Sequence, residues 1–540
     1  MRPHRLLLPC LLAVFLHAST PPAIRAATTF DLTRASIADI NAAFDAGALT
    51  SEHLTGLFLK RIAAYDKEGP KLRAVITLNP DALADARALD AERKEKGPRG
   101  PLHGIPILIK DNTDVAGLPT TAGFYALKDN IATTDAEQTR RLRAAGCVIV
   151  GKTNMSEFAS GSAISTLGGT MLNPHSLDRS PSGSSGGSGA GIAAGYAVLA
   201  TGTDTGGSIR GPSAANGIAG LKPTYGLTGR SGIIPLSLSL DTVGPMARHV
   251  SDLAVALNVM AGEDPGDPVT LGVDRPTVDY TSGLHRDALK GKRLGLLRDF
   301  MGRHEGVDAV IETAVAVLRA QGAEVVEIKL PRFVLGVNAG LYLAIRDPEF
   351  RYQIEDYLAS LPEGYPKTHE EIIALSEKIK ADNEDGTFRN DNRLRAYQRE
   401  AKAGTLADTP YLSALSDGKK IVTENLTWFL ESENLDAFIV PTSTSPARLN
   451  KSESSDSNDS AATNISISGA AHLANVTGWP DLIVPAGFTS HPKLPVALSF
   501  IGPAFSEARL LALGYAFEQA LPVRALPAET PRLDGETFDY

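Results

Sequence analysis

Apolar residues recur along this chain with two different periods. Ile37, Ile40 and Phe44 follow Ser36 at three- and four-residue intervals, and a second run of the same period begins near Ser51. Such spacing places the apolar side chains on one face of a helix, and a serine just before the run is a good helix cap. The pattern predicts a pair of helices lying against a core.

Elsewhere, short apolar runs alternate with longer amphipathic segments. The runs predict strands at residues 72–78, 105–109, 147–150, 197–203, 294–297, 324–328, 437–440, 482–484 and 496–501. The amphipathic segments predict helices at residues 82–96, 135–146, 307–321, 506–520 and, capped by Ser251, 251–262. Strands that alternate with helices indicate an α/β layer architecture.

One long segment departs from this alternation. Residues 333–427 are more charged and carry helical periods with no strand signal and no recognisable motif. We expect this segment to be a helical insertion or a cap over the sheet. Residues 452–464 are rich in serine, aspartate and asparagine, which predicts a mobile loop.

The first residues have the pattern of a secretory signal peptide. Basic residues precede an apolar run at 6–16, and the small residues Ala26 and Ala27 follow it. The run is too short to span a bilayer as a helix. We therefore expect residues 1–26 to be a signal peptide, residues 27–540 to be the mature domain, and the protein to be periplasmic or secreted.

Composition narrows the possible partners. The 540 residues are 43% hydrophobic and 21% charged, with a net charge of −9 spread along the chain without a basic stripe. This distribution argues against nucleic acid as a partner, and no later segment resembles a membrane anchor. Cys10 lies in the leader, so the mature chain is expected to have one cysteine, Cys147, and no internal disulfide.

Candidate chemistry gathers in residues 181–226. Two clusters of serine and glycine flank a small-residue helix and an apolar strand, after which the chain turns sharply into another predicted helix at Ser208. A serine at such a turn has uncrowded backbone N–H groups beside it, so an oxyanion could bind there. Ser208 is therefore a candidate nucleophile. A flexible linker is the alternative, but linkers do not contain an apolar strand.

Two other serine or aspartate motifs compete with Ser208. Residues 183–187 match the G-x-S-x-G elbow with Ser185 at its centre, but that elbow needs a strand before it, and residues 175–181 are polar. Residues 204–206 spell the Asp-Thr-Gly of aspartic proteases, in one copy only.

Residues 146–153 match the pattern of a phosphate-binding loop. We reject this interpretation because the variable positions of the pattern form an apolar strand here.

A base for Ser208 must come from elsewhere, because neither glycine cluster contains a histidine. Lys110 ends a buried apolar run, and Ser184 could connect it to Ser208. A lysine acts as a base only when neutral, and lowering its pKa from about 10.4 to about 7 to 8 costs roughly 4 kcal/mol. Burial beside hydroxyl groups could supply the free energy needed to lower the pKa of Lys110. A surface lysine just after a strand is the alternative.

Several linked motifs carry a resemblance to a known family. In order, they are GIPILIKDN at 104–112, GKTN at 151–154, GSSGG at 183–187, GTDTGGSIR at 202–210 and WPDLIVP at 479–485. Together they resemble the amidase signature family. The resemblance implies a single large α/β domain, 27–540, whose mixed sheet is covered by helices on both faces, with the catalytic core at about 70–270.

The resemblance also implies a mechanism. Lys110 would be the base, Ser184 the bridging serine after a cis Gly183–Ser184 peptide, and Ser208 the acylated nucleophile. The implied oxyanion hole uses the backbone N–H groups of Thr205, Gly206, Gly207 and Ser208. Asp204 and Arg210 would pair to hold the turn, and Ser185 would assist Lys110. No metal or cofactor is implied.

Within that family the chain is most similar to the bacterial peptide amidases, which implies deamidation of peptides with an amidated C-terminus by a monomer or homodimer. Two loops depart from their pattern, at residues 158–169 and 452–464, and both are expected to border the pocket. The alternatives are an aryl-acylamidase or esterase on the same site, a subunit of an amidotransferase, and an inactive, receptor-like family member. The predicted signal peptide and the intact Lys110, Ser184 and Ser208 argue against the last two.

Overall fold

A computed structural model describes residues 28–275, 277–383, 388–450 and 470–540. The predicted signal peptide at 1–26 and the loop at 452–464 lie outside these residues. Within the described part of the chain, no helix is both long and apolar enough to cross a membrane.

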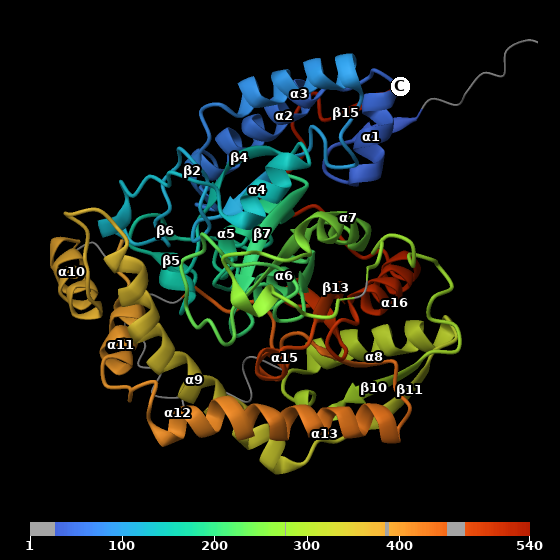
Figure 1. Ribbon diagram of the computed structural model, residues 1–540. Coiled ribbons are helices and arrows are strands. Elements are labelled where there is room, and N and C mark those ends of the chain that lie inside the picture. Colours follow the sequence, from blue (N-terminus) through green and yellow to red (C-terminus); the bar gives the residue numbers. More distant parts are fainter. Residues whose placement is uncertain (1–27, 276, 384–387, 451–469) are drawn as a thin grey trace, which may run out of the picture.

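One mixed sheet runs through the molecule (Figure 1). Its eleven described strands lie in the order β11 (Glu324–Ile328), β10 (Arg293–Leu297), β12 (Ala437–Pro441), β14 (Pro495–Ile501), β13 (Asp481–Phe488), β8 (Ala219–Lys222), β9 (Thr242–Ala247), β7 (Leu199–Asp204), β3 (Pro106–Lys110), β4 (Val148–Thr153) and β2 (Val75–Leu78). β3 pairs in parallel with both β4 and β7, whereas β7 and β9 are antiparallel. The predicted mixed sheet is confirmed.

Helices cover both faces of this sheet, and the side chains on both sides of its strands are therefore buried. Ile107 and Ile109 of β3 face one core with α7 (Val250–Met260), α8 (Glu305–Ala320) and α16 (Glu507–Ala520). Leu108 between them faces a second core with α5 (Gly186–Ala193). The remaining helices of the main body are α1 (Ile37–Asp45), α2 (Ser51–Ile62), α3 (Ala82–Lys96), α4 (Glu137–Ala144), α6 (Arg210–Asn216) and α15 (Ala471–Thr477).

The described part of the segment 333–427 is mostly helical. It forms α9 (Arg332–Ala359), α10 (His369–Asp382), α11 (Asp391–Glu400), α12 (Thr409–Ser413) and the start of α13 (Lys419–Ser432). Figure 1 shows these helices as an arc along one side of the molecule, away from α1, α2 and α3. We call this arc, residues 332–432, the cap.

Several predicted boundaries are wrong. β2 begins at Val75 because Lys71 and Arg73 have positive φ angles and cannot extend the strand. Ser251 lies inside α7 and does not cap it. The chain at His249 is extended, and the N–H of Val250 donates to the Glu518 carboxylate at 3.1 Å, so a tertiary contact replaces the expected cap.

Two neighbouring strands, β8 and β9, were not predicted, and β9 lies next to β7. β8 and β9 carry glycine and proline, which are poor strand formers. Tight packing explains the glycine at position 244, because a Cβ there would lie 2.1 Å from the Leu221 carbonyl oxygen on the neighbouring strand. Here tertiary packing overrides strand propensity.

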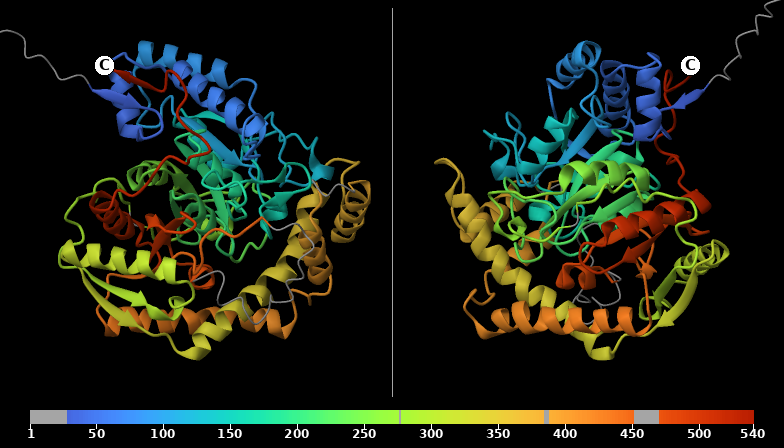
Figure 2. Two further views of the ribbon diagram at one scale, coloured as in Figure 1. Left: turned by 180° about the vertical axis from the view of Figure 1, so that it is seen from behind. Right: turned by 45° about the vertical axis from the view of Figure 1, so that its right-hand side comes forward.

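The two ends of the described chain meet. β1 (Thr29–Asp31) pairs antiparallel with β15 (Thr537–Asp539), and the views of Figure 2 show the C-terminal segment running back to the N-terminal helices. Nearby, Arg61 of α2 forms a buried ion pair with Glu536 at 2.8 Å. The last residues of the chain are therefore part of the N-terminal packing.

Candidate active site

Three neighbouring elements bring the predicted catalytic residues together. β3 ends in Lys110, and its parallel neighbour β7 ends in Asp204 and leads into the glycine turn, residues 204–210. α5 begins just after Ser184, and the Gly183–Ser184 peptide is cis, as the resemblance implies. The ends of β3 and β7 lie at the same edge of the sheet, which is where such folds place their sites.

Lys110 is fully buried and touches two hydroxyl groups. Its Nζ lies 2.7 Å from Ser184 Oγ, 2.8 Å from Thr203 Oγ1 and 3.3 Å from the Thr203 carbonyl oxygen. Burial lowers the pKa of Lys110 to about 7, against the opposing effect of the Asp204 and Asp241 carboxylates. A large share of Lys110 is thus neutral at pH 7, which a base requires.

A backbone hydrogen bond brings Ser185, and with it the adjacent Ser184, close to Ser208. The N–H of Ser185 donates to the Ser208 carbonyl at 3.1 Å, and Ser185 Oγ donates to the Thr203 carbonyl at 3.3 Å. Among the described residues, Ser184 Oγ and Ser208 Oγ share no hydrogen bond. Ser185 thus contacts the carbonyl that Lys110 also contacts, and it does not bond to Lys110 itself.

The glycine turn is held by Asp204 and Arg210, as predicted. Arg210 pairs with Asp204 at 2.9 Å and with Asp481 at 3.2 Å, and Asn475 Nδ2 donates to Asp204 at 2.9 Å. Burial raises the pKa of Asp204, but the guanidinium of Arg210 more than offsets this and holds it below its usual range. The turn is therefore fixed by a buried, ionised network.

One predicted oxyanion donor is already engaged. The N–H of Gly207 donates to Asp204 Oδ1 at 2.9 Å, so this group holds the turn. Within the described chain, the N–H groups of Thr205, Gly206 and Ser208 have no hydrogen-bond partner. Ser208 is 9% exposed, and α6 begins two residues after it. The turn thus places the hydroxyl of Ser208, a residue that is nearly fully buried, beside three unpaired N–H groups.

The cap reaches the turn through Tyr342 of α9. A Cβ on Gly206 would lie 2.5 Å from Tyr342 Oη, so only glycine allows this close approach. The Tyr342 ring stacks on His472 with ring centres 4.1 Å apart. Burial, with the charge of Arg210, lowers the pKa of His472 to about 3, so its ring is neutral at pH 7. An aromatic pair therefore borders the turn.

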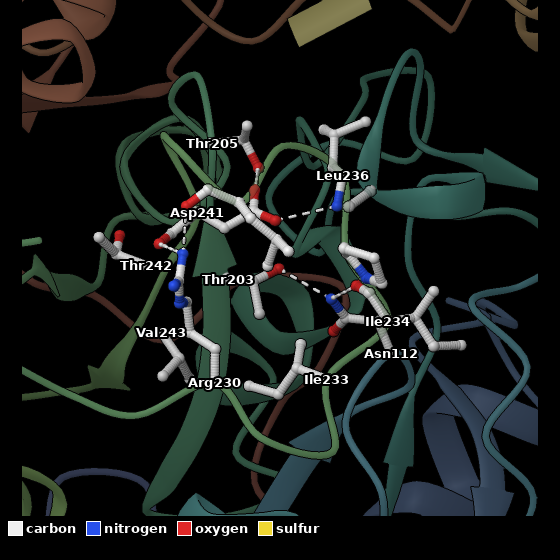
Figure 3. A pocket seen from close by; sticks show the side chains of 13 residues that line it. Asn112, Thr203, Thr205, Arg230, Ile233, Ile234, Leu236, Asp241, Thr242 and Val243 are labelled. Carbon is white, nitrogen blue, oxygen red and sulfur yellow. Dashed lines mark hydrogen bonds between the residues drawn. The ribbon is translucent and has the colours of Figure 1, made fainter. Parts of the chain in front are cut away.

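A narrow pocket lies beside the Lys110 contacts (Figure 3). Its polar lining includes Asn112 and Thr203, joined at 3.2 Å, and Asp241, which accepts a hydrogen bond from the Thr205 hydroxyl. Burial raises the pKa of Asp241 to about 6. Ala159, from the loop at 158–169, also lines this pocket.

Phe158 of that loop turns away from the pocket. It is 1% exposed and packs against Phe124, Phe350 and Tyr397, with ring centres 5.3 to 6.2 Å apart. Phe158 thus anchors the loop beneath the cap, and the next residue, Ala159, lines the pocket. Among the described residues, no group of three His, Cys, Asp or Glu side chains is placed to hold a metal ion.

Sequence reasoning missed six residues that shape the site: Thr203, Asp241, Tyr342, His472, Asn475 and Asp481. Thr203 and Asp481 lie inside the motifs GTDTGGSIR and WPDLIVP, so those motifs were a usable signal. Tyr342 lies in the segment without any motif, 333–427, and only the packing of α9 on Gly206 reveals it.

Comparison with known proteins places this geometry in a family. The amidase family matches residues 53–511. The A subunit of glutamyl-tRNA(Gln) amidotransferase from Halorhodospira halophila is 38% identical over 498 residues, which cover 90% of this chain and 96% of the relative. The native peptide amidase of Stenotrophomonas maltophilia superimposes with a TM-score of 0.82 at 39% identity, covering 92% of this chain and 99% of that one.

Two further solved structures share the fold. Peptide amidase in complex with the competitive inhibitor chymostatin is 40% identical, with a TM-score of 0.83, and covers 92% of this chain and 99% of its own. The corresponding amidotransferase A subunit from Thermotoga maritima is 27% identical, with a TM-score of 0.66, and covers 92% and 98%. On its motifs, its fold and the length of these matches, the chain belongs to the amidase family.

Proposed function

We propose that this protein is a serine amidase that removes the terminal amide of peptides through an acyl-enzyme and releases ammonia. The observation that carries the proposal is the buried contact of 2.7 Å between Lys110 Nζ and Ser184 Oγ, next to the turn that contains Ser208. A neutral lysine, a bridging hydroxyl and a nucleophile beside free N–H groups are the parts that acyl transfer needs.

The hydrogen bonds of Lys110 set the direction of proton transfer. A neutral amine has two N–H donors and one lone pair. The hydroxyl and the carbonyl of Thr203 each accept one N–H, which leaves the lone pair for the proton of Ser184. As Ser208 Oγ attacks the amide carbon, Ser184 takes the proton of Ser208 and then returns a proton to the leaving nitrogen.

The developing oxyanion would be bound by the N–H groups of Thr205, Gly206 and Ser208. Removal of a single oxyanion donor typically costs about 10²–10³ in kcat. After ammonia leaves, water attacks the acyl-enzyme with Lys110 and Ser184 again as the base. Asp204 and Arg210 hold the turn, and Ser185 and Thr203 hold the groups around Lys110.

The peptide substrate is supported by the 39–40% identity and the TM-scores above 0.8 with peptide amidases. The test is incubation of the purified chain with amidated peptides and with the same peptides as free acids. Mass spectrometry should show a gain of about one dalton on the amides only, with ammonia released in equal amount. Cleavage of internal bonds, or activity on anilides alone, would favour the aryl-acylamidase alternative.

A second candidate is a role within a multi-subunit amidotransferase, favoured by the 38% identity with the curated relatives of that name. It predicts hydrolysis of free glutamine and dependence on other subunits. An assay of the single chain on glutamine and on a peptide amide separates the two: a peptide amidase uses only the second, without added protein.

We further propose that residues 1–26 direct export and are then removed, so that the enzyme acts in the periplasm or outside the cell. The support is the order of basic, apolar and small residues at the start of the chain. N-terminal sequencing of the exported protein tests this, and a retained Met1 would contradict it.

A further inference from the structure

One face of the long cap helix α9 touches the catalytic half of the molecule repeatedly. Tyr342, Arg346, Glu349 and Gln353 are spaced by four, three and four residues, so they share one face of the helix. Tyr342 meets Gly206, and Arg346 donates to Ser160 at 3.0 Å. These four polar or aromatic residues all lie on the face of α9 that is turned toward the candidate site. A helix that only covered the sheet would not require so many of them there.

Glu349 binds the loop at residues 236–241, which lies between the cap and the glycine turn. It is fully buried, and its carboxylate accepts hydrogen bonds from Ser237 Oγ at 2.6 Å and from the N–H of Ser239 at 3.0 Å. Gln353 accepts from the N–H of Leu238 at 2.8 Å. α9 thus fixes three consecutive residues of this loop.

The other end of the same loop is bonded to the glycine turn. Asp241 accepts hydrogen bonds from the N–H groups of Leu236 at 2.9 Å and Ser237 at 3.0 Å, and from the hydroxyl of Thr205 (Figure 3). Thr205 is the first residue of the turn to offer a free N–H. A continuous series of buried hydrogen bonds therefore runs from α9 to the proposed oxyanion hole.

We propose that α9 positions the oxyanion hole: Glu349 and Asp241 act as positioning residues for Thr205, while Tyr342 holds Gly206 from the other side. The inference rests on the proposed function, because it assigns a role within that reaction. The physical reason is geometric. Donors must lie about 2.7–3.1 Å from the oxyanion, and a misplacement of about 1 Å can cost about 10²-fold in rate.

The decisive variant is Glu349→Gln, which keeps the size of the side chain and replaces one acceptor oxygen with a donor. One carboxylate oxygen accepts from Ser237 Oγ and the N–H of Ser239, and the other accepts from Ser239 Oγ and Tyr411 Oη, so the new donor faces the loop in either orientation. We expect kcat on a peptide amide to fall about 10- to 100-fold, with KM changed less than about threefold. The matched control is Glu355→Gln on the same helix, which removes a carboxylate that accepts from the N–H of His369 and does not touch the loop. It should leave kcat close to that of wild type.

A double-mutant cycle separates positioning from general loosening. Thr205→Val keeps the backbone N–H but removes the hydroxyl that reaches Asp241, so it should lower kcat as Glu349→Gln does. Because both changes break one series of bonds, the double variant should lose no more than the larger single loss. Multiplied losses, or a Glu349→Gln variant as active as the control, would overturn the inference.

Two readouts keep the test independent of other failures. The rate of Ser208 labelling by a fluorophosphonate should also fall about 10- to 100-fold in Glu349→Gln, and this needs no knowledge of the natural substrate. If wild type and Glu355→Gln label rapidly but hydrolyse no amide, the proposed substrate is wrong and the labelling rates still decide the inference. If Glu349→Gln does not fold, Ser239→Ala removes the hydroxyl that also donates to the Glu349 carboxylate, and it should slow labelling without lowering the melting temperature.

Discussion

The glycine turn and the cap both bury arginine among carboxylates, yet they use these pairs differently. In the turn, Arg210 and Asp204 are six residues apart, and the hydrogen bonds between them fix the conformation of the backbone around Ser208. In the cap, Arg346 of α9 and Arg393 of α11 meet Glu400, at 3.1 Å and 2.7 Å, and join two helices. The first network fixes the turn that holds the proposed nucleophile, and the second holds one helix against another.

The two networks therefore differ in what their loss should affect: the reaction in the case of the turn, and stability in the case of the cap. A change in the turn should remove activity from a protein that remains folded. A change in the Glu400 network should instead make the cap less stable, while each molecule whose cap is folded, with α9 in place, still reacts normally. The loop at 236–241 is the place where the two regions are connected, through Glu349 on one side and Asp241 on the other.

The largest effect is expected at the nucleophile. Ser208→Ala should reduce hydrolysis to background, because no acyl-enzyme can form. A fluorophosphonate should label wild type and Ser185→Ala on Ser208, mapped by peptide sequencing, and should not label Ser208→Ala. An adduct on Ser184 or Ser185 would show that the turn is not the reacting region.

Next in size are the proton carriers. Lys110→Ala and Ser184→Ala should each lower kcat by about 10²–10⁴-fold, the usual worth of general acid–base help. Because burial lowers the pKa of Lys110 to about 7 and only the neutral amine is a base, kcat/KM should fall about tenfold per pH unit below pH 7 and be flat above it. A profile that stays flat down to about pH 5 would exclude Lys110 as the base.

A smaller effect is expected at Thr203. Thr203→Val keeps the shape but removes the hydroxyl that accepts from Lys110 Nζ at 2.8 Å, so the amine is oriented less well. We expect kcat to fall about 10-fold, since one orienting hydrogen bond contributes about 1–1.5 kcal/mol. Thr201→Val is the matched control: its hydroxyl accepts from the backbone N–H of Lys110 and does not touch the amine, and kcat should change little.

The smallest effect on turnover, but a large one on stability, is expected in the cap. Burial alone would raise the pKa of Glu400, but Arg393 and Arg346 lower it from 4.5 to about 2. This pairing contributes about 3 kcal/mol at about 1.36 kcal/mol per pH unit. The contribution is complete above pH 4.5 and is lost as the pH falls toward about 2.

Glu400→Gln should therefore lower the denaturation midpoint at pH 7 and flatten its dependence on pH between about 5 and 2. Glu377→Gln, on the neighbouring helix α10 and exposed, should leave the midpoint unchanged. Turnover per folded molecule should be close to wild type in both. A Glu400→Gln variant that stays stable but loses activity would contradict the division between the two regions.

The predictable part of the site is the part that is local in sequence. The strand, turn and helix around Ser208 bring Asp204, Arg210 and the N–H donors together within seven residues, and motif and period suffice to find them. Lys110 became a candidate because it ends a strongly patterned apolar run, and Ser184 because it lies in the motif GSSGG. The sheet followed from apolar runs, except where glycine and proline in β8 and β9 hid the strands.

The unpredictable part is assembled across distant elements. Glu349 lies 112 residues from Ser237, and nothing in the period of α9 marks its buried face as different from an ordinary amphipathic stripe. The engaged N–H of Gly207 was missed for a related reason, since only the folded turn shows that Asp204 bends back to accept it. Such contacts depend on where helices are placed, which sequence patterns do not encode.

The pairing of β1 with β15 has a consequence for the order of folding. Thr29 and Asp539 are 510 residues apart, and Arg61 in α2 gains its carboxylate partner only from Glu536. A chain made from its N-terminus therefore carries a guanidinium that it cannot bury in an ion pair until nearly the last residue is available. The final packing of the N-terminal helices therefore waits for the tail.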